Sequence, residues 1–262
     1  MWVGLSRGDE TIVLSLVGIA SKCSRSSKVS ARLPGFFIGG TYKNKPIGSC
    51  RYSDITIFSF HPVKVITSGE GGMAVTNDSG LAEKMALLRS HGITRDPDQL
   101  SNPNPPAYYY EQKALGFNYR MTDIHAALGC SQMNRLDAFV ARRAQLAERY
   151  DMLLCNSPVT PPWQHPDGTS GWHIYVIRLQ LEKIAPTHQQ VFEYMRGKGI
   201  GVNLHYIPVH TQPWYRQMGF EPGMFPESEK YYQEALTLPL FPAMTEDDQD
   251  KVVKTLHEAV KL

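Results

Sequence analysis

The chain has 262 residues, of which 42% are hydrophobic and 20% charged, and its 27 basic and 25 acidic residues leave a net charge of +2. This composition predicts a globular protein and excludes wholesale disorder, collagen-like repeats and a long coiled coil. The balanced charge gives no support for a nucleic acid or a charged membrane surface as a partner. The four cysteines are scattered without a C-x-x-C pair, which favours reduced thiols over a disulfide framework or a zinc site.

Residues 1–38 differ from the rest of the chain. The apolar run Thr11–Ala20 is too short to span a bilayer, and the residues before it lack the net positive charge of a secretory leader. The following stretch, SKCSRSSKVSAR, is polar and serine-rich without clear periodicity. We therefore expect 1–38 to be divergent or weakly structured, and we expect the protein to be cytoplasmic.

Regular patterning begins at Gly39. Alternating β-rich residues over 54–60 predict a strand, and Met73–Thr76 predicts a second one. Ser79 is the expected N-cap of a helix over 80–90, with Gly92 just past its end. The proline-, asparagine- and tyrosine-rich residues 96–110 predict a long loop, and long loops in compact domains often carry function.

A long helix is predicted next, from the N-cap Thr122 to about Leu154, because apolar residues recur there with a helical period. We expect this helix to end a large domain over 39–154. The proline-rich segment 157–170 then predicts a linker.

The remainder, 155–262, predicts a smaller α/β domain. Strands are expected at 173–181 and 200–206, and a helix is expected from Thr187 to near Gly197. The pattern Thr245-x-x-Asp248 resembles a capping box at the start of the last helix.

The residues with the clearest chemical potential are Ser59-Phe60-His61-Pro62-Val63-Lys64, followed by Gly69-Glu70-Gly71-Gly72. A lysine held just past an apolar strand, beside a glycine-rich turn, can be partly desolvated, which lowers its pKa and makes the free amine available as a nucleophile for an aldehyde. Ser59 can offer a hydroxyl to a phosphate, and the glycines allow close approach of the backbone to a ligand. Taken alone, Lys64 is more simply explained as a solvated loop lysine, because lysines after strands are common.

These residues resemble a known family. The pattern FSFHPVK-x-IT-x-GEGG is similar to the Schiff-base lysine region of the DegT/DnrJ/EryC1/StrS family, and four further motifs follow in the same order: LLRSHGI, LGFNYRMTDIHAALG, LDAFVARR and HYIPVHTQPWY. The resemblance covers roughly 39–262. It implies an α/β fold of the aspartate aminotransferase type (PLP fold type I), with an N-terminally incomplete large domain and a smaller C-terminal α/β domain.

The resemblance also implies a cofactor, pyridoxal 5'-phosphate (PLP), and a reaction. Lys64 matches the lysine that binds PLP and moves protons during transamination, and Ser59 matches a residue that binds the PLP phosphate. Asn118 matches an asparagine that reaches the cofactor of the partner subunit, which implies a homodimer with a shared active site. His205 and Tyr206 match a segment near the substrate, although packing at a strand end is an alternative role for them. Tyr108–Tyr110 either line the sugar pocket or pack the loop.

Within the family, the motif around Lys64 is most similar to that of the transaminases that form UDP-4-amino-4,6-dideoxy-N-acetyl-β-L-altrosamine in the pseudaminic acid pathway. This implies transamination of a UDP-linked 4-keto-6-deoxy-N-acetylhexosamine, with glutamate as the expected amino donor. Action on another nucleotide keto sugar is the alternative within the family. His205 and His210 lie five residues apart without a third ligand motif, so no metal site is expected.

The sequence departs from the family pattern before residue 39. Members carry an aspartate there that pairs with the pyridinium nitrogen of PLP, whereas this chain reads SARLPGFFIGG over 30–40, without an aspartate. A catalytically impaired, truncated family remnant is therefore a further alternative. We hypothesise that 1–38 is an out-of-frame translation or a replaced start, which an intact upstream family frame in register with residue 39 would support.

Overall fold

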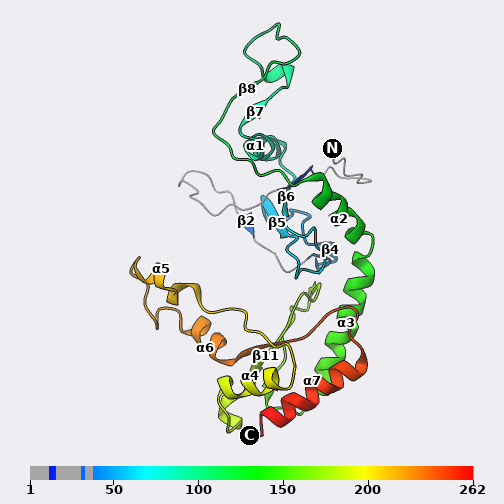
Figure 1. Ribbon diagram of the computed structural model, residues 1–262, viewed down its shortest axis with the longest axis vertical. Coiled ribbons are helices and arrows are strands. Elements are labelled where there is room, and N and C mark those ends of the chain that lie inside the picture. Colours follow the sequence, from blue (N-terminus) through cyan, green and yellow to red (C-terminus); the bar gives the residue numbers. More distant parts are fainter. Residues whose placement is uncertain (1–11, 16–30, 33–37, 262) are drawn as a thin grey trace. The chain divides into compact units, whose positions relative to one another are not determined.

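The computed structural model describes residues 12–15, 31–32 and 38–261 (Figure 1). Most of the segment 1–38 thus lies outside the described residues, and its expected weak structure stays a prediction there; its described parts include two short strands, Ile12–Ser15 and Ala31–Arg32. The chain divides into two compact units: an N-terminal unit that runs to Ala138 and includes Asp167–Gly171, and a C-terminal unit of Phe139–Pro166 and Trp172–Leu262. Among the helices described, none is long and apolar enough to cross a membrane.

The sheet of the N-terminal unit has its strands in the order β1-β6-β5-β2. Its centre is the antiparallel hairpin of β5 (Ile55–Ser59) and β6 (Gly72–Thr76), which confirms both strands predicted here. β1 (Ile12–Ser15) pairs antiparallel with β6, and β2 (Ala31–Arg32) pairs parallel with β5. Burial alternates along β5, as expected of a strand with one face in the core.

Helix α1 (Ser79–Arg89) follows β6 directly. Its N-cap is Asp78, whose carboxylate accepts a 2.8 Å hydrogen bond from the Leu81 N–H, so the prediction of Ser79 as the cap is wrong by one residue. Both residue types favour the N-cap, and the acidic one has the additional advantage of the helix dipole. Gly92 lies just past the end of the helix with φ +69°, as predicted.

Two smaller sheets also belong to this unit, each built from two-residue strands. One has the order β10-β3-β4, and the other is the β7–β8 pair. A 3-10 turn, η1, lies in the loop between β7 and β8. The bounds are β3 (Thr41–Tyr42), β4 (Lys45–Pro46), β7 (Ile93–Thr94), η1 (Pro97–Gln99), β8 (Glu111–Gln112) and β10 (Gly168–Thr169).

The predicted long helix is two helices, α2 (Asp123–Met133) and α3 (Leu136–Leu153). Thr122 is the N-cap of α2, as predicted, and accepts from the His125 N–H. The single-helix prediction is wrong because the chain tightens between them: the Arg135 N–H donates to the Gln132 carbonyl three residues back, at 3.0 Å. The C-cap Asn134 is also a weak helix former.

The C-terminal unit has an antiparallel sheet in the order β12-β11-β9. Its core is formed where this sheet meets the apolar faces of α3, α4 and α7, around the fully buried Tyr150, Tyr175 and Leu256. The predicted linker 157–170 contributes β9 to this sheet. The bounds are β9 (Val159–Thr160), β11 (Tyr175–Leu179), η2 (Leu181–Lys183), α4 (His188–Gly197), η3 (Val209–Thr211), α5 (Pro213–Arg216), α6 (Pro226–Glu234), β12 (Ala235–Leu238) and α7 (Glu246–Ala259).

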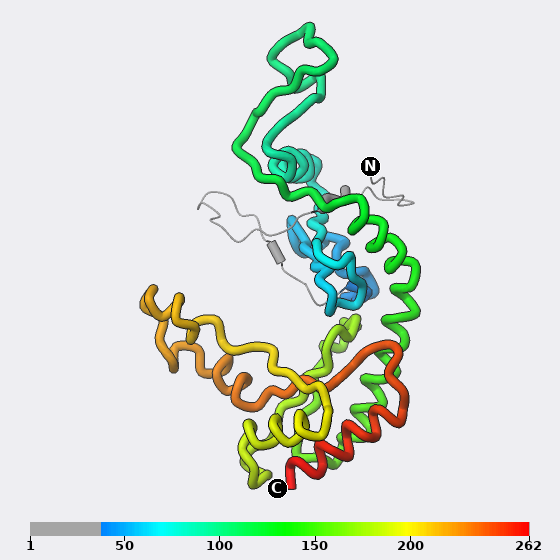
Figure 2. Tube along the Cα trace, viewed as in Figure 1, coloured from blue at the N-terminus to red at the C-terminus, as the bar shows by residue number. Residues whose placement is uncertain are grey.

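Residues 200–206, predicted as a strand, form only an isolated bridge in which Asn203 and Thr237 exchange backbone hydrogen bonds of 3.2 and 2.8 Å. The Asn203 side chain accepts from the next N–H, that of Leu204, at 2.8 Å. Such local side-chain bonds compete with a strand ladder and explain why pairing stops after one residue. The trace in Figure 2 shows the chain running on from here through the excursion that carries α5 and α6.

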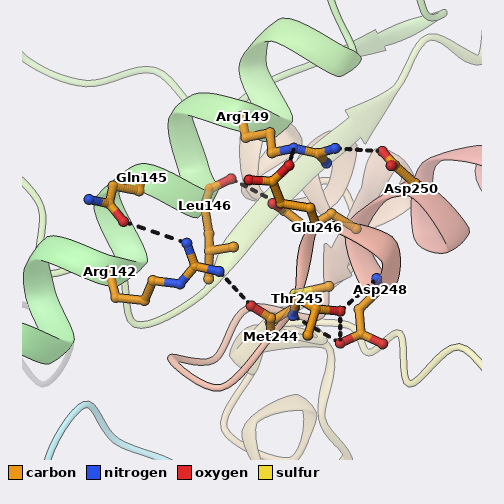
Figure 3. A network of polar contacts seen from close by, with 10 residues as sticks. Arg142, Gln145, Leu146, Arg149, Met244, Thr245, Glu246, Asp248 and Asp250 are labelled. Atoms are coloured by element: carbon orange, nitrogen blue, oxygen red, sulfur yellow. Dashed lines mark hydrogen bonds and ion pairs between the residues drawn. The ribbon is translucent and has the colours of Figure 1, made fainter.

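Helices α3 and α7 are joined by polar contacts (Figure 3). Arg149 forms a 2.8 Å ion pair with Asp250, and the buried Gln249 donates to the Leu146 carbonyl at 2.8 Å. At the start of α7, Thr245 and Asp248 form the predicted capping box. The N-cap Thr187 of α4 forms a second capping box, with Gln190. The two capping boxes thus satisfy backbone N–H groups at the starts of α4 and α7.

Candidate functional site

Lys64 lies in the loop that joins β5 to β6, at the point where this hairpin ends. Ser59 and Gly72 are paired across the last position of the hairpin. The loop returns on itself because the Ser68 N–H donates to the Phe60 carbonyl at 3.1 Å. Lys64 itself closes a turn, with its N–H 2.9 Å from the His61 carbonyl oxygen. The backbone of the predicted lysine is therefore fixed by the loop's own hydrogen bonds.

Apolar residues anchor the loop directly after the lysine. Val65 and Ile66 are buried, with 5% and 1% of their surface exposed, while Lys64 is half-buried. Burial lowers the pKa of the Lys64 amine from its usual 10.5. A lowered pKa increases the neutral fraction of the amine, which is the form that attacks an aldehyde. Lys64 is thus partly desolvated rather than fully solvated, which is the less favoured of the two interpretations that its position after a strand allows.

The glycine-rich turn after Lys64 packs against the start of α2. Gly71 has φ +141°, and a Cβ at this position would collide with the Met121 side chain. A Cβ on Gly69, whose φ is +81°, would lie 3.6 Å from the His125 ring. The glycines therefore bring the loop backbone close to a helix, which gives the Lys64 loop a fixed support.

Ser59 is half-buried at the end of β5. Its Oγ accepts a long hydrogen bond, 3.4 Å, from the His61 N–H. Across the mouth of the loop, His61 Nε2 lies 3.9 Å from the Glu70 carboxylate. The hairpin thus brings a hydroxyl, an amine and an imidazole–carboxylate pair to one loop, and Ser59 and Lys64 are the two predicted site residues that it carries.

Two residues of this loop were not predicted as important. The Thr67 hydroxyl donates to the Phe60 carbonyl at 3.0 Å and accepts from the Gly69 N–H at 2.9 Å. The fully buried Ser68 donates to the Glu70 carbonyl at 2.7 Å. Both hold the turn through local side-chain bonds to the backbone. The signal was available in the sequence, because Thr-Ser-Gly is typical of a hydroxyl-stabilised turn.

Asn118 lies on a different segment of the same unit. It forms an isolated antiparallel bridge with Ser90 at the end of α1. The neighbouring N–H groups of Phe117 and Tyr119 donate to the Leu88 and Arg89 carbonyls at 3.1 and 2.9 Å. The Asn118 residue is itself exposed, so the segment holds its backbone firmly and leaves its side chain accessible.

His205 and Tyr206 belong to the C-terminal unit. His205 Nδ1 lies 2.8 Å from the Thr237 hydroxyl on β12, and its ring meets that of Tyr206 edge to face at 4.7 Å. Tyr206 is 59% exposed. In the N-terminal unit, Tyr109 donates to Glu111 at 3.0 Å, whereas Tyr108 is exposed. No group of three potential metal ligands is found in the described part of the chain.

Comparison with known proteins extends these observations. Residues 37–257 match the model of the DegT/DnrJ/EryC1/StrS aminotransferase family. The chain is 37% identical to SpsC of Bacillus subtilis, a spore coat polysaccharide biosynthesis protein, over 84% of this chain and 57% of SpsC.

Two solved structures are similar over most of the chain. PseC of Helicobacter pylori, an aminotransferase involved in the biosynthesis of pseudoaminic acid, is 28% identical with a TM-score of 0.78, over 88% of this chain and 59% of that one. The PMP form of Spr1654 from Streptococcus pneumoniae is 27% identical with a TM-score of 0.79, again over 88% and 59%. Spr1654 is also known in a PLP form.

This chain therefore spans less than two thirds of the length of these relatives. Over that span it has the mixed α/β fold of the PLP-dependent aminotransferases of fold type I, as predicted. The family match covers most of the described residues, including both the Lys64 loop and the segment around Asn118. The chain belongs to the DegT/DnrJ/EryC1/StrS aminotransferase family.

Proposed function

We propose that this protein is a PLP-dependent sugar aminotransferase that converts a UDP-linked 4-keto-6-deoxy-N-acetylhexosamine to its 4-amino sugar, with glutamate as donor. The observation that carries the proposal is the half-buried Lys64, whose amine has a lowered pKa on a loop fixed by its own hydrogen bonds. Membership of an aminotransferase family supports the reaction class. The similarity to PseC supports the choice of sugar and of the pseudaminic acid pathway.

The residues of the Lys64 loop fit the cofactor that this chemistry needs. The desolvated amine of Lys64 suits an aldehyde, and the half-buried hydroxyl of Ser59 at the end of β5 suits a phosphate oxygen. When bound, PLP supplies an aldehyde and an electron-withdrawing ring, which stabilises negative charge at the carbon that carries the amine. We assign Lys64 and Ser59 to its binding.

Lys64 has a second role in this proposal. An amine whose pKa is lowered releases and accepts a proton more readily near neutral pH than an ordinary lysine does. The backbone that carries this amine is held by the hydrogen bond from the Lys64 N–H to the His61 carbonyl, which limits the region that Nζ can reach. We therefore assign Lys64 as the group that holds and moves the proton at Nζ during transamination.

Asn118 is proposed to act in the active site of a partner subunit. Its exposed side chain on a rigid backbone suits a contact outside its own unit. Large apolar side chains nearby are also exposed, including Leu115 at 87%, Phe117 at 60% and Ile124 at 82%. Several exposed apolar residues within ten positions of the sequence are typical of an interaction surface. They support a homodimer with a shared site.

The substrate side is assigned to His205 and Tyr206. Through its bond to Thr237, the His205 ring is held in a defined orientation, and Tyr206 presents an accessible ring and hydroxyl. Both groups suit a polar sugar with an apolar face. We propose that they contact the nucleotide sugar.

Two alternatives are favoured by specific observations. Similarity to SpsC, whose pathway is that of a spore coat polysaccharide, supports a different nucleotide keto sugar as substrate. The absence of an aspartate in 30–40 supports a family remnant with impaired catalysis, because the pyridinium nitrogen of PLP lacks its expected partner there.

Absorbance spectroscopy of the purified chain with added PLP tests the proposal. We expect a visible band that glutamate removes, and we expect Lys64→Ala to lose this band. Lys45→Ala, which changes an exposed lysine of the same unit, is the matched control and keeps it. Circular dichroism verifies that Lys64→Ala is folded. Mass spectrometry with alternative UDP-linked 4-keto sugars then identifies the substrate. Absence of a Lys64-dependent band in the folded wild-type chain favours the impaired remnant.

A further inference from the structure

Three arginines of the N-terminal unit gather near one open depression of the surface. The depression has a volume of about 460 Å³ and is lined by Ser90, Ile93, Arg95, Tyr110 and Arg120. Arg89 is adjacent in the chain to Ser90 and lies close enough to Arg120 for the two like charges to repel. None of these three arginines belongs to the site assigned above to the cofactor or the sugar.

The fold brings these residues together from four separated segments. Ser90 caps the C-terminal end of α1, Arg95 directly follows β7, and Tyr110 directly precedes β8. Arg120 comes from the segment before α2, which is tied to α1 by the 2.9 Å hydrogen bond from the Tyr119 N–H to the Arg89 carbonyl. The depression therefore lies where the β7–β8 hairpin and this segment both meet the end of α1.

The positive charge in this place is not neutralised by neighbouring carboxylates. Within the described residues, none of the three arginines forms an ion pair. Glu111 pairs with Lys113, and Asp96 accepts hydrogen bonds from the Asp98 N–H and the Gln99 amide. The nearby acids are therefore committed to the hairpin itself.

The arginine side chains differ in how they are held. Arg89 Nε is buried and has no hydrogen-bond partner in the described part of the chain. Burial and the charge of Arg120 both lower the pKa of the Arg89 guanidinium. The Arg95 guanidinium lies 5.6 Å from the centroid of the Tyr110 ring, which orients it over that ring. Clustered like charges are unfavourable unless an anion offsets them.

We propose that this depression binds a phosphoryl anion with two or more negative charges, and that this anion is the diphosphate of the sugar nucleotide. The second part rests on the proposed function. A diphosphate offers several acceptor oxygens to guanidinium forks and to the Ser90 and Tyr110 hydroxyls. A single carboxylate offsets only one of the two arginine charges, those of Arg95 and Arg120, that line the depression. The open shape also suits a large ligand rather than an enclosed ion.

The chain position of Arg120 links the anion site to the proposed active site. Arg120 is two residues from Asn118, and Asn118 is bridged to Ser90, which lines the depression. If Asn118 reaches the cofactor of a partner subunit, these arginines lie beside the substrate of that same subunit. The inference therefore adds a diphosphate-binding function to the segment that carries Asn118.

Calorimetric titration with inorganic pyrophosphate, UDP and glutamate tests this inference. It is performed on the full 262-residue chain and on its Lys64→Ala variant, so that the result does not depend on PLP chemistry. Arg95→Gln and Arg120→Gln are each expected to weaken pyrophosphate and UDP binding by about tenfold or more, since each removes charge-assisted hydrogen bonds. Arg196→Gln makes the same change at an exposed position of the other unit and leaves both affinities unchanged.

The outcomes are distinct. If the substitutions weaken pyrophosphate binding but leave UDP binding unchanged, the phosphoryl site is supported, but the nucleotide is rejected as the ligand that supplies the phosphoryl groups. Pyrophosphate affinity that does not respond to either substitution, in variants with unchanged melting temperature, overturns the proposal. Weakened glutamate binding with unchanged pyrophosphate binding also overturns it, because the arginines then serve a carboxylate. A chain that lacks the Lys64-dependent band and still shows the arginine-dependent affinity retains the anion site without the proposed catalysis.

Discussion

A Cβ on Gly71 would collide with the terminal methyl of Met121 and lie 2.9 Å from Ser68 Oγ, so a side chain at this position requires Met121, at the start of α2, to move. The Gly71 φ of +141° is also unfavourable for any residue with a side chain. We expect Gly71→Ala to lower the free energy of unfolding by more than about 1 kcal/mol, since both the backbone conformation and the packing oppose the methyl group. Urea denaturation of the two proteins measures this loss.

Gly199→Ala is the matched control for this substitution. Gly199 also has a positive φ, +78°, but no atom lies within 4 Å of its added Cβ. The loss of stability in Gly199→Ala therefore measures the cost of the backbone conformation alone, without a steric collision. A loss in Gly71→Ala no larger than the loss in Gly199→Ala means that α2 yields to the methyl group and does not support the loop rigidly.

The lowered pKa of Lys64 predicts a shift in the pH dependence of its reactivity. We expect acylation of Lys64, followed by mass spectrometry of its peptide, to reach half its maximal rate at a lower pH than acylation of a free N-acetyl-lysine does. Burial is the cause, because it disfavours the charged form.

The lowered pKa of Lys64 also affects stability. The folded chain binds this proton less tightly than the unfolded chain, so the Lys64 contribution to stability rises with pH between its lowered pKa and 10.5. A titration that coincides with that of N-acetyl-lysine contradicts the desolvation of this amine.

Local chemistry explains which parts of the fold are predictable from the sequence. Thr122 and Thr245 are N-caps as predicted, and Thr187 is an N-cap at the predicted start of its helix, because capping depends on a side chain and the N–H groups two or three residues away. The choice between Asp78 and Ser79 is harder, since two adjacent residues suit the same role. The helix break at Asn134 was missed because apolar periodicity continues across it.

Long-range pairing explains the rest. The isolated bridge at Asn203 depends on backbone pairing with Thr237 on a distant segment. The alternation of apolar and polar residues over 200–206 cannot reveal how far this pairing extends. The Lys64 loop is recognisable from its motif, whereas the position of Lys64 after a strand does not by itself distinguish a partly desolvated amine from a solvated one. The support of this loop by Met121 and His125 was not predictable, because these contacts join segments fifty or more residues apart. The depression lined by Arg95 and Arg120 also depends on contacts between segments that are distant in the sequence.

Arg143 is expected to be among the most sensitive positions of the C-terminal unit. Only 6% of its surface is exposed, and Nη1 donates to the carbonyls of Trp172, His173 and Leu240 at 3.1, 3.2 and 2.8 Å. We expect Arg143→Met to cost about 3 kcal/mol or more, because it leaves buried carbonyls without a donor. Thermal and urea denaturation measure the cost.

The neighbouring arginine provides the comparison for this prediction. Arg142 is half-buried and donates to one backbone carbonyl, that of Met244, at 2.7 Å, with a long 3.5 Å bond to the exposed side chain of Gln145. Arg142→Met is expected to cost about 1 kcal/mol, the usual contribution of one hydrogen bond. Equal losses in the two variants exclude the carbonyl network as the reason for the burial of Arg143.

Glu111 predicts an acid-sensitive contribution from the β7–β8 hairpin. A hydrogen bond from Lys113, with further bonds from Ser101 and Tyr109, lowers the pKa of the Glu111 carboxyl from 4.5 to about 2. A lowered carboxyl pKa stabilises the fold fully above 4.5 and loses this effect as the pH falls towards 2. We expect the stability difference between the wild type and Glu111→Gln to shrink between pH 6 and pH 3. Glu83→Gln on the exposed surface of α1 controls for net charge, and a difference that is constant over this pH range excludes a role for the Glu111 charge.

The proposed shared active site predicts complementation between two inactive variants. If Asn118 completes the site of the partner's Lys64, a hybrid dimer of Lys64→Ala and Asn118→Ala chains contains one site with both residues intact and one site with neither. Random mixing in equal amounts makes about half of the dimers hybrids, so about one quarter of the wild-type activity is expected from two chains that are each inactive alone. Co-expression with two different affinity tags isolates the hybrids for the assay. A site built within one chain gives no recovery, since every site of a hybrid then carries one substitution, and that result moves Asn118 to the site of its own subunit.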